Sequence, residues 1–308
     1  MKTMWEKVIS ALLALVILVQ LAPLPTFAAT EGADGGSGVL LSELEESASP
    51  ATLEGEVEEL RTEEGKHFRL TDGSYLSVSY GTPVHYQDEE GQWQDIDNTL
   101  TPDARSYHTG DNDGVTASFA KDLSHGQLAA AACGDVSVSM GLLHPTQVQP
   151  LPAGQPDYDR SVTAEVEAEP AVMSLSAGEG WRAEDLVPAA LSASVLYREV
   201  YPGVDLRYTA HSYDLKEQII LREKQERYRY DFLLTLDGLT AHLQEDGSVL
   251  LNDAQGAAVY CIPAPYMVDA EGSTSNAAEY LLQETAEGTV LSVEADKAWM
   301  DGASFPVT

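Results

Sequence analysis

The chain of 308 residues has little cysteine and little positive charge. Its two cysteines, Cys133 and Cys261, are too few for a disulfide-rich scaffold, and the sequence leaves open whether they form one disulfide or remain two thiols. Lys and Arg total 17 against 50 Asp and Glu, which gives a net charge of −33. Because such a charge repels nucleic acids and anionic membrane surfaces, we predict neither as a partner.

The sequence also lacks the short motifs of common enzyme classes: a G-x-S-x-G elbow, H-E-x-x-H, a P-loop and a dinucleotide fingerprint. Paired carboxylates such as Asp95 and Asp97 would serve glycoside hydrolysis only if they lay close in space, and fifty acids make chance pairs abundant. The seven histidines stand singly, with none at metal-ligand spacing: His67, His85, His108, His125, His144, His211 and His242. We therefore predict no catalytic, cofactor-binding or metal-binding residues, no cofactor, and a protein that is not an enzyme.

The first 28 residues have the order of a secretory signal peptide: two lysines, an apolar run and a small-residue exit. Residues 8–24 are nearly long enough for a retained membrane anchor, but Gln20 and Pro23 favour cleavage after Ala28. Cleavage removes two Lys and one Glu, so the net charge goes from −33 to −34. We predict a secreted, extracellular protein with no mature transmembrane segment.

Composition divides the remaining chain into four segments. We predict a flexible acidic leader over residues 29–65, where large apolar residues are few, with a short helix near 53–62 as an alternative. A first β-rich domain follows over 66–144, a Pro-rich acidic linker over 145–190, and a second β-rich domain over 191–308 that we expect to be truncated at its C-terminal end. The short alternating segments predict an all-β fold of antiparallel, sandwich-like sheets, without settling whether there are one or two sandwiches.

Two successive stretches of the first β-rich domain read as hairpins. "HFRLTDGSYLSVSYG" alternates about an Asp72-Gly73 turn. In "GTPVHYQDEEGQWQDIDNTL", residues 81–100, the acids after Tyr86 supply the turn and Trp93 begins the return strand. Cation binding by Asp88, Glu89 and Glu90 is an alternative, but alternating strand geometry would separate their side chains.

A second acidic stretch, "TGDNDGVTASFA", matches part of a calcium-binding loop. Asp111 and Asp113 occupy ligand positions, whereas Thr109 and Ala120 stand where the first and the bidentate last ligand belong. The missing carboxylates favour a turn over an ion site.

Longer motifs carry a resemblance to a family. Two stretches resemble the N-terminal region of secreted clostridial and other Gram-positive wall-associated proteins of the polymorphic-toxin type, which carry DNRLRE domains and RHS/YD repeats: "EVEELRTEEGKHFRLTDGSYLSVSYGTPVHYQDEEGQWQDIDNTL" and "SVLYREVYPGVDLRYTAHSYDLKEQIILRE". "IPAPYMVDAEG" and "KAWMDGASFPVT" look similar as well. The resemblance spans His67 to Thr308, with a poor match from Pro145 to Pro188, and it leaves open whether Thr308 is a natural end.

This resemblance implies a non-enzymatic, N-terminal structural or interaction module of a secreted or wall-associated surface protein. Its partners would be downstream modules of the same polypeptide, if the reading frame continues, and the cell wall. The alternative is a free-standing carbohydrate- or cell-wall-binding adhesin domain, in which Trp93, Trp181 and nearby tyrosines stack on sugar. A hydrolase that uses two of the many carboxylates is a third reading.

Overall fold

The computed structural model describes residues 51–143, 157–167, 186, 188 and 190–308. They fall into two compact units, residues 51–95 with 186 and 188, and residues 96–143, 157–167 and 190–308. Within this described part, strands dominate and every strand pairing is antiparallel, which confirms the all-β prediction. The predicted signal peptide, residues 1–28, lies outside the described residues.

The smaller unit holds a three-stranded sheet in the order β1-β2-β3 and a separate hairpin, β4-β5. The strands are β1 (Leu53–Glu56), β2 (Gly65–Leu70), β3 (Tyr75–Ser79), β4 (His85–Gln87) and β5 (Trp93–Asp95), with a single turn of 3-10 helix at Glu58–Leu60.

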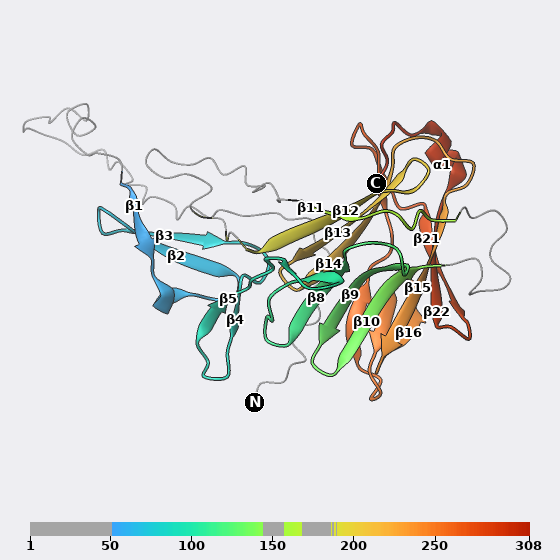
Figure 1. Cartoon of the computed structure of the whole chain (residues 1–308). Helices are drawn as coiled ribbons and strands as arrows, with labels where there is room; N and C mark the ends of the chain where they lie inside the picture. Colours follow the sequence, from blue (N-terminus) through green and yellow to red (C-terminus); the bar gives the residue numbers. More distant parts are fainter. Residues whose placement is uncertain (1–50, 144–156, 168–185, 187, 189) are drawn as a thin grey trace, which may run out of the picture. The chain divides into compact units, whose positions relative to one another are not determined.

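The larger unit is built on an eight-stranded sheet, in the order β21-β22-β15-β10-β9-β8-β7-β6. Its strands are β6 (Thr101–Pro102), β7 (Ser106–His108), β8 (Val115–Ala120), β9 (Gln127–Cys133), β10 (Val136–Leu142), β15 (Arg229–Asp237), β21 (Ala278–Glu284) and β22 (Thr289–Ala295). Figure 1 shows β8, β9, β10 and β15 side by side.

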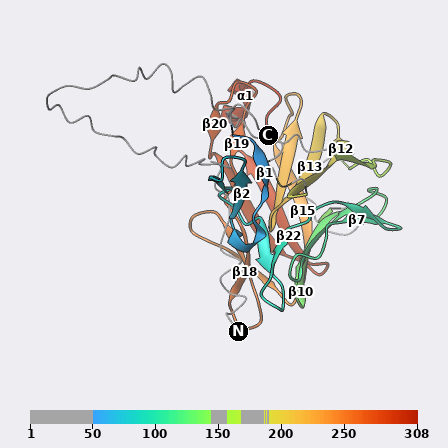
Figure 2. The same ribbon diagram turned by 90° about the vertical axis from the view of Figure 1, so that its left-hand side faces the viewer.

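Three smaller sheets complete this unit. A four-stranded sheet consists of β11 (Ala164–Glu167), β12 (Ser192–Tyr201), β13 (Val204–His211) and β14 (Asp214–Leu221), in that order. A three-stranded sheet consists of β16 (Thr240–Leu243), β17 (Val249–Asn252) and β18 (Ala258–Ile262). The third is a two-stranded sheet of β19 (Met267–Val268) and β20 (Thr274–Ser275). The helix α1 (Lys297–Gly302) begins at Asp296, whose side chain accepts a hydrogen bond from Trp299 N, and lies beside β19 and β20 in Figure 2.

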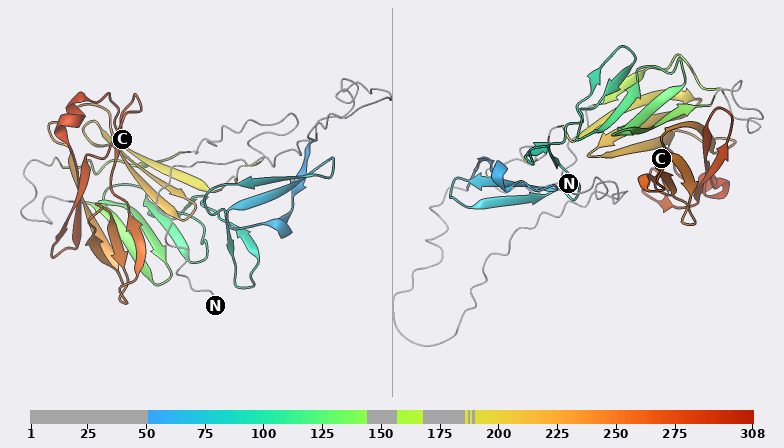
Figure 3. Two further views of the ribbon diagram at one scale, coloured as in Figure 1. Left: turned by 180° about the vertical axis from the view of Figure 1, so that it is seen from behind. Right: turned by 90° about the horizontal axis from the view of Figure 1, so that it is seen from below.

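The main core lies between the eight-stranded and the four-stranded sheets. Alternation puts Val204, Leu206 and Tyr208 of β13 on the buried face, where they pack with Phe119 and Phe232 of the larger sheet. A second core cluster, around Leu234, Val249 and Leu251, packs the other end of β15 against the three-stranded sheet. Figure 3 shows these layers from behind and from below. One face of the eight-stranded sheet is thus covered by two smaller sheets, as in a sandwich.

Both predicted hairpins are present. The first joins β2 to β3 with Phe68 opposite Leu76, and Gly73 takes a φ of +84° in its turn, a conformation that costs other residues more than glycine. The second joins β4 to β5 with Tyr86 opposite Gln94. Local turn chemistry was enough to identify both hairpins.

The sheet pairing differs from the predicted division into domains 66–144 and 191–308. Strand β10, from the first predicted domain, pairs with β15, from the second, and Met140 stands opposite Leu234. Strands from both segments therefore share one sheet, because an alternating strand such as "VSVSM" specifies a face and not a partner. The linker over 145–190 lies mostly outside the described residues, although its residues 164–167 form β11; the domain bounds themselves stay a prediction.

The leader predicted over residues 29–65 also differs where the structure describes it. Residues 53–56 form β1, which pairs with β2, and Glu58–Leu60 form the 3-10 turn in place of the helix considered for 53–62. The physical reason is that β2 offers a free edge and an ion-pairing partner for Glu56, so this stretch needs few apolar residues of its own. The rest of the leader lies outside the described residues.

Candidate functional site

The acids of residues 81–100 shape the β4–β5 hairpin. Asp88 Oδ1 accepts hydrogen bonds from the backbone N of Glu90 and of Gln92, at 3.1 and 2.8 Å, and its Oδ2 accepts from Gln94 Nε2 at 2.7 Å. The Gln92 backbone bond comes first among the causes that hold the pKa of Asp88 below its ordinary value. Asp88 therefore stabilises the turn, which is the role that its position predicts.

Asp95, at the end of the hairpin, belongs to an ionic cluster of the smaller unit. Lys66 Nζ lies 2.5 Å from Asp95 Oδ1 and 3.3 Å from Glu56 Oε2, and Arg61 Nε lies 2.6 Å from Glu56 Oε1. His85 is fully buried, donates from Nδ1 to the Thr62 carbonyl at 2.6 Å, and holds Nε2 at 3.5 Å from Asp95. We call Glu56, Arg61, Lys66, His85 and Asp95 the ionic cluster.

In the ionic cluster two carboxylates face one ammonium and one guanidinium, and His85 Nε2 lies 3.5 Å from Asp95. His85 and then the Lys66 ammonium hold the pKa of Asp95 well below its ordinary range. Burial alone would raise the pKa of Glu56, but the hydrogen bond from Arg61 and the charge of Lys66 lower it. These carboxylates are ionised and satisfied by protein cations, so the cluster is built for stability rather than for acid-base chemistry.

The stretch "DIDN" fixes a corner of the larger unit. Asn98, which is 2% exposed, donates from Nδ2 to the carbonyls of Leu191 and Ser212 at 2.8 and 2.9 Å. Asn112, equally buried, donates to Asn98 Oδ1 and accepts from Asp97 N. These amides join the segment after β5 to the residue before β12 and to the turn after β13, so the motif has a structural role.

A serine, a histidine and an aspartate meet at the β6–β7 turn. His108 Nε2 lies 2.6 Å from Asp103 Oδ2 and 2.9 Å from Ser106 Oγ. In a catalytic triad the acid and the serine engage different ring nitrogens. Here both share Nε2, and Asp103 also accepts from the backbone N of Arg105 and Ser106, which makes this group a capped turn.

Residues 109–120, which match part of a calcium-binding loop, also begin with a turn. Asp111 Oδ1 accepts a hydrogen bond from Gly114 N at 2.6 Å, and the backbone of Asn112 pairs with that of Val115. Throughout the described ranges, no group of three or more His, Cys, Asp or Glu side chains could hold a metal ion. His144 lies outside the described residues. Neither Cys133 nor Cys261 is in a disulfide, so the two-thiol alternative is the one that the structure contains.

Within the main core, the hydroxyl of Tyr208 donates a hydrogen bond to Glu217 Oε1. Tyr208 is 1% exposed, Glu217 is half-buried on β14, and the Tyr208 hydroxyl also lies 3.4 Å from Met140 Sδ. Burial raises the pKa of Glu217 to about 7, although the hydrogen bond from Tyr208 opposes the shift. This carboxyl titrates near neutrality, which a strand pattern gives no means of predicting.

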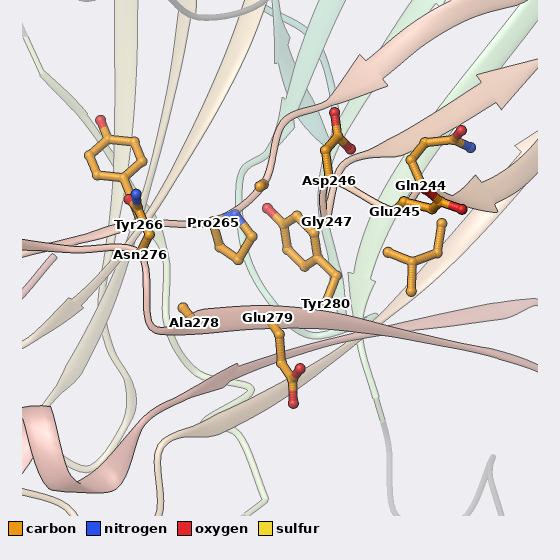
Figure 4. A pocket seen from close by; sticks show the side chains of 12 residues that line it. Gln244, Glu245, Asp246, Gly247, Pro265, Tyr266, Asn276, Ala278, Glu279 and Tyr280 are labelled. Atoms are coloured by element: carbon orange, nitrogen blue, oxygen red, sulfur yellow. The ribbon is translucent and has the colours of Figure 1, made fainter.

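A cavity of about 500 Å³ opens in the larger unit between the β16–β17 turn, the loop before β19 and the start of β21. Two tyrosines contribute to it, Tyr266 with 47% of its surface exposed and Tyr280. Figure 4 shows Tyr280 and Pro265 between Tyr266 and Asn276 on one side and the turn residues on the other. The full lining is Leu243, Gln244, Glu245, Asp246, Gly247, Ala264, Pro265, Tyr266, Asn276, Ala278, Glu279 and Tyr280.

The β16–β17 turn gives one wall of this cavity a fixed shape. Asp246 Oδ1 accepts from Ser248 N at 3.0 Å and from Ser248 Oγ at 2.7 Å, and the hydroxyl bond comes first among the causes that lower the pKa of Asp246. Gly247 has a φ of +85°, and a Cβ built on it would lie 3.4 Å from the Ala264 side chain. The side chain of Glu279 points away from Tyr280 in Figure 4, so Glu245 and Asp246 are the acids on the turn side of the cavity.

Sequence reasoning identified none of the cavity residues. Trp93, proposed for sugar stacking, is instead half-buried in the smaller unit, with its ring centroid 6.3 Å from that of His85. Trp181 lies outside the described residues. The one available signal was the tyrosine in "IPAPYMVDAEG", which stands between a proline and a strand of apolar residues.

Comparison with known proteins identifies relatives in Gram-positive bacteria, while no family model matches the chain. The chain is 24% identical over 317 residues to the tRNA(Glu)-specific nuclease WapA of Bacillus subtilis subsp. natto, and 24% identical over 324 residues to the tRNA nuclease WapA of Bacillus subtilis. Each match covers 96% of this chain and 12% of the relative. A wall-associated protein of Geobacillus stearothermophilus is 25% identical over 219 residues, which are 70% of this chain and 75% of that protein.

These relatives support the resemblance to Gram-positive wall-associated proteins. They also overturn the prediction that the protein is not an enzyme, because relatives that match 96% of the chain are named tRNA nucleases. The reason for the error is one of scope. The matched residues are 12% of those nucleases, so the absence of enzyme motifs from this chain has no bearing on the whole proteins.

No helix in the part of the chain that the structure describes is long and apolar enough to span a membrane. The relative that is named a wall-associated protein is consistent with a location at the cell wall or outside the cell.

Proposed function

We propose that the chain is a β-rich module of a wall-associated surface protein and that it helps to hold this protein at the bacterial cell wall. The observation that carries the proposal is the match to the Geobacillus wall-associated protein, three quarters of which, 75%, corresponds to this chain. Since most of that protein lies inside the match, the most economical place for its wall association is the shared β-rich segment.

The charge of the chain restricts how such binding would work. A net charge of −33 gives no general attraction to anionic polymers. The module would therefore bind the wall through a specific short-range site or through its neighbouring modules. Binding through a specific site resists salt, whereas diffuse electrostatic attraction is screened beyond about 10 Å at 0.1 M salt. We therefore expect wall binding that persists at high ionic strength.

The finer part of the proposal concerns the intact protein. We propose that export by the signal peptide over residues 1–28 precedes wall association, and that DNRLRE domains and RHS/YD repeats are the other modules of the polypeptide. The support is the motif resemblance of residues 67–100 and 194–223, together with relatives about eight times as long as this chain. Sequencing the DNA beyond the codon for Thr308 tests this part, and a stop codon there would contradict it.

A co-sedimentation assay with purified Gram-positive cell walls tests the main proposal. The folded chain is expected in the pellet at 0.1 M and at 0.5 M sodium chloride. The heat-unfolded chain, which has the same composition and charge, is the control and is expected in the supernatant. A folded chain that stays in the supernatant at both salt concentrations would contradict the proposal.

A second candidate function is tRNA cleavage, favoured by the names of three relatives. Those names belong to proteins of which the matched segment is 12%, so the proposal applies to the protein that contains this module. Incubating the purified chain with total tRNA, followed by a denaturing gel, tests whether the described module itself contributes. Specific fragments would assign cleavage to this segment, and intact tRNA would place any nuclease activity elsewhere.

A further inference from the structure

We infer that the cavity formed by Tyr266, Tyr280 and the β16–β17 turn binds a pyranose sugar of a cell-wall glycan. The inference rests on the proposed wall association and names the chemistry by which the module would recognise the wall. At about 500 Å³ the cavity falls within the size range of small-molecule sites, which is about 300–1,000 Å³. It has room for one or two sugar rings.

The first argument is the pair of surfaces that the cavity combines. A pyranose ring has apolar C–H faces and a rim of hydroxyls, so its site needs flat apolar surface beside polar groups. Tyr266 offers an exposed aromatic surface, and Pro265 and Leu243 add aliphatic surface. Tyr266 and Leu243 are 47% and 45% exposed, so the lining keeps apolar surface open to a ligand.

The second argument is the set of polar groups along the lining. Glu245 and Asp246 offer carboxylate oxygens that accept hydrogen bonds from hydroxyls, and Asn276 carries both a donor and an acceptor. Asp246 is already oriented by two hydrogen bonds from Ser248, so its other oxygen is held in place without further ordering. Such preorganised planar groups match the alternating donors and acceptors of sugar hydroxyls.

The third argument excludes other ligands. None of the described residues that line the cavity is Lys, Arg or His, so a phosphate, a nucleotide or an acidic sugar would meet carboxylates with no compensating cation. A basic peptide would satisfy the carboxylates and stack its cations on Tyr266, so it is the rival ligand that the experiment below distinguishes. A sugar without negative charge uses both the carboxylates and the flat surface of Tyr266 and Pro265.

Isothermal titration calorimetry of the full chain tests the inference, with chitotetraose as the first probe and a soluble muramidase digest of purified wall as the second. We expect saturable binding of at least one probe. The variant Tyr266→Ala is expected to weaken it about tenfold, which corresponds to a loss of about 1.4 kcal/mol with the aromatic face. The control Tyr75→Ala removes an equally exposed tyrosine, 50% against 47%, from the smaller unit and should leave binding unchanged.

Two further measurements separate the sugar from a basic peptide. Binding of the sugar should be the same at 0.1 and 0.5 M sodium chloride, and any heat from a lysine tetramer, which a net charge of −33 attracts generally, should be the same for wild type and Glu245→Gln. Three results would each overturn the inference. They are flat titrations with both sugar probes, equal sugar affinity of Tyr266→Ala and wild type, and binding of the lysine tetramer that Glu245→Gln abolishes. Circular dichroism checks that the variants are folded.

Wall co-sedimentation distinguishes this inference from the proposed function. If wild type pellets and Tyr266→Ala remains in the supernatant, the sugar site and the proposed wall association are both supported. If both proteins pellet equally and the sugar titrations are flat, the cavity is not the site and the proposed function survives. If wild type binds the sugar but stays out of the pellet, the site is supported and the proposed wall association fails.

Discussion

The hydrogen bond from the buried Tyr208 to the half-buried Glu217 belongs to a pair that makes the stability of the larger unit depend on pH in a predictable direction. Burial raises the pKa of Glu217 from 4.5 to about 7, so the folded state holds this proton more tightly than the unfolded state does. Below pH 4.5 the carboxyl is protonated in both states and destabilises nothing. As the pH rises from 4.5 to 7 the unfolded state ionises first, and stability is lost progressively until the loss is complete above pH 7.

The size of this effect follows from the shift. One pKa unit corresponds to about 1.4 kcal/mol, so the ionised carboxyl costs about 3 kcal/mol of unfolding free energy at pH 8 and about 1 kcal/mol at pH 5. Glu217→Gln keeps the shape and the acceptor for the Tyr208 hydroxyl but cannot ionise. The variant should therefore gain about 2.5 kcal/mol over wild type between pH 5 and pH 8.

Urea unfolding followed by far-UV circular dichroism, at pH 5 and pH 8, measures the difference. Taking the difference between variant and wild type removes the contribution of the other acids, which titrate in both proteins. Glu226→Gln, at an exposed position of the same unit, is the matched control and should give the same difference from wild type at both pH values. If Glu217→Gln also gave equal differences at pH 5 and pH 8, the desolvated carboxyl would be refuted.

Three further predictions concern structural groups. Lys66→Met removes a cation from the ionic cluster and should lower the unfolding free energy of the smaller unit by about 2–3 kcal/mol, measured by hydrogen exchange of β2 amides. The control Lys216→Met, at an exposed position, should change the unfolding free energy of the larger unit by under about 0.5 kcal/mol. Asn98→Ala removes the two buried hydrogen bonds to the carbonyls of Leu191 and Ser212 and one acceptor of Asn112 Nδ2, and should cost about 2–3 kcal/mol in urea unfolding; a change below about 0.5 kcal/mol would contradict that role. Calorimetric titration with millimolar calcium should release no heat, because Asp111 and Asp88 already bind turn amides; a saturable heat that Asp111→Ala abolishes would reverse this view.

The hairpins were predictable from sequence because their turns and strands are adjacent in the chain. The Asp72-Gly73 turn and the alternation on either side of it specify β2 and β3 without any reference to the rest of the fold. The same holds for the turn that Asp88 caps. All-β class followed from the repetition of such units.

The pairing across the larger sheet was not predictable in the same way. β10 meets β15 although about ninety residues separate Met140 from Leu234, and alternation tells only which side chains are buried. The ionic cluster has the same origin, since Lys66 of β2 joins Glu56 of β1 to Asp95 of β5. A search for charged motifs along the chain cannot find groups that only the fold brings together.

The candidate site shows most clearly which features the sequence does not predict. Its aromatic and acidic walls come from the turn at 244–247 and from Tyr266 and Tyr280, none of which stands out in the sequence beside the four tryptophans. Sugar stacking was therefore sought at Trp93, which the fold packs beside His85. Exposure, which decides whether an aromatic side chain can meet a ligand, is a property of the tertiary structure.

Co-sedimentation of the folded chain with purified Gram-positive cell walls, at 0.1 and 0.5 M sodium chloride, tests the proposed wall association most directly. We predict that the folded chain pellets with the walls at both salt concentrations while the heat-unfolded chain does not. A folded chain that remains in the supernatant under both conditions would contradict wall association by this module.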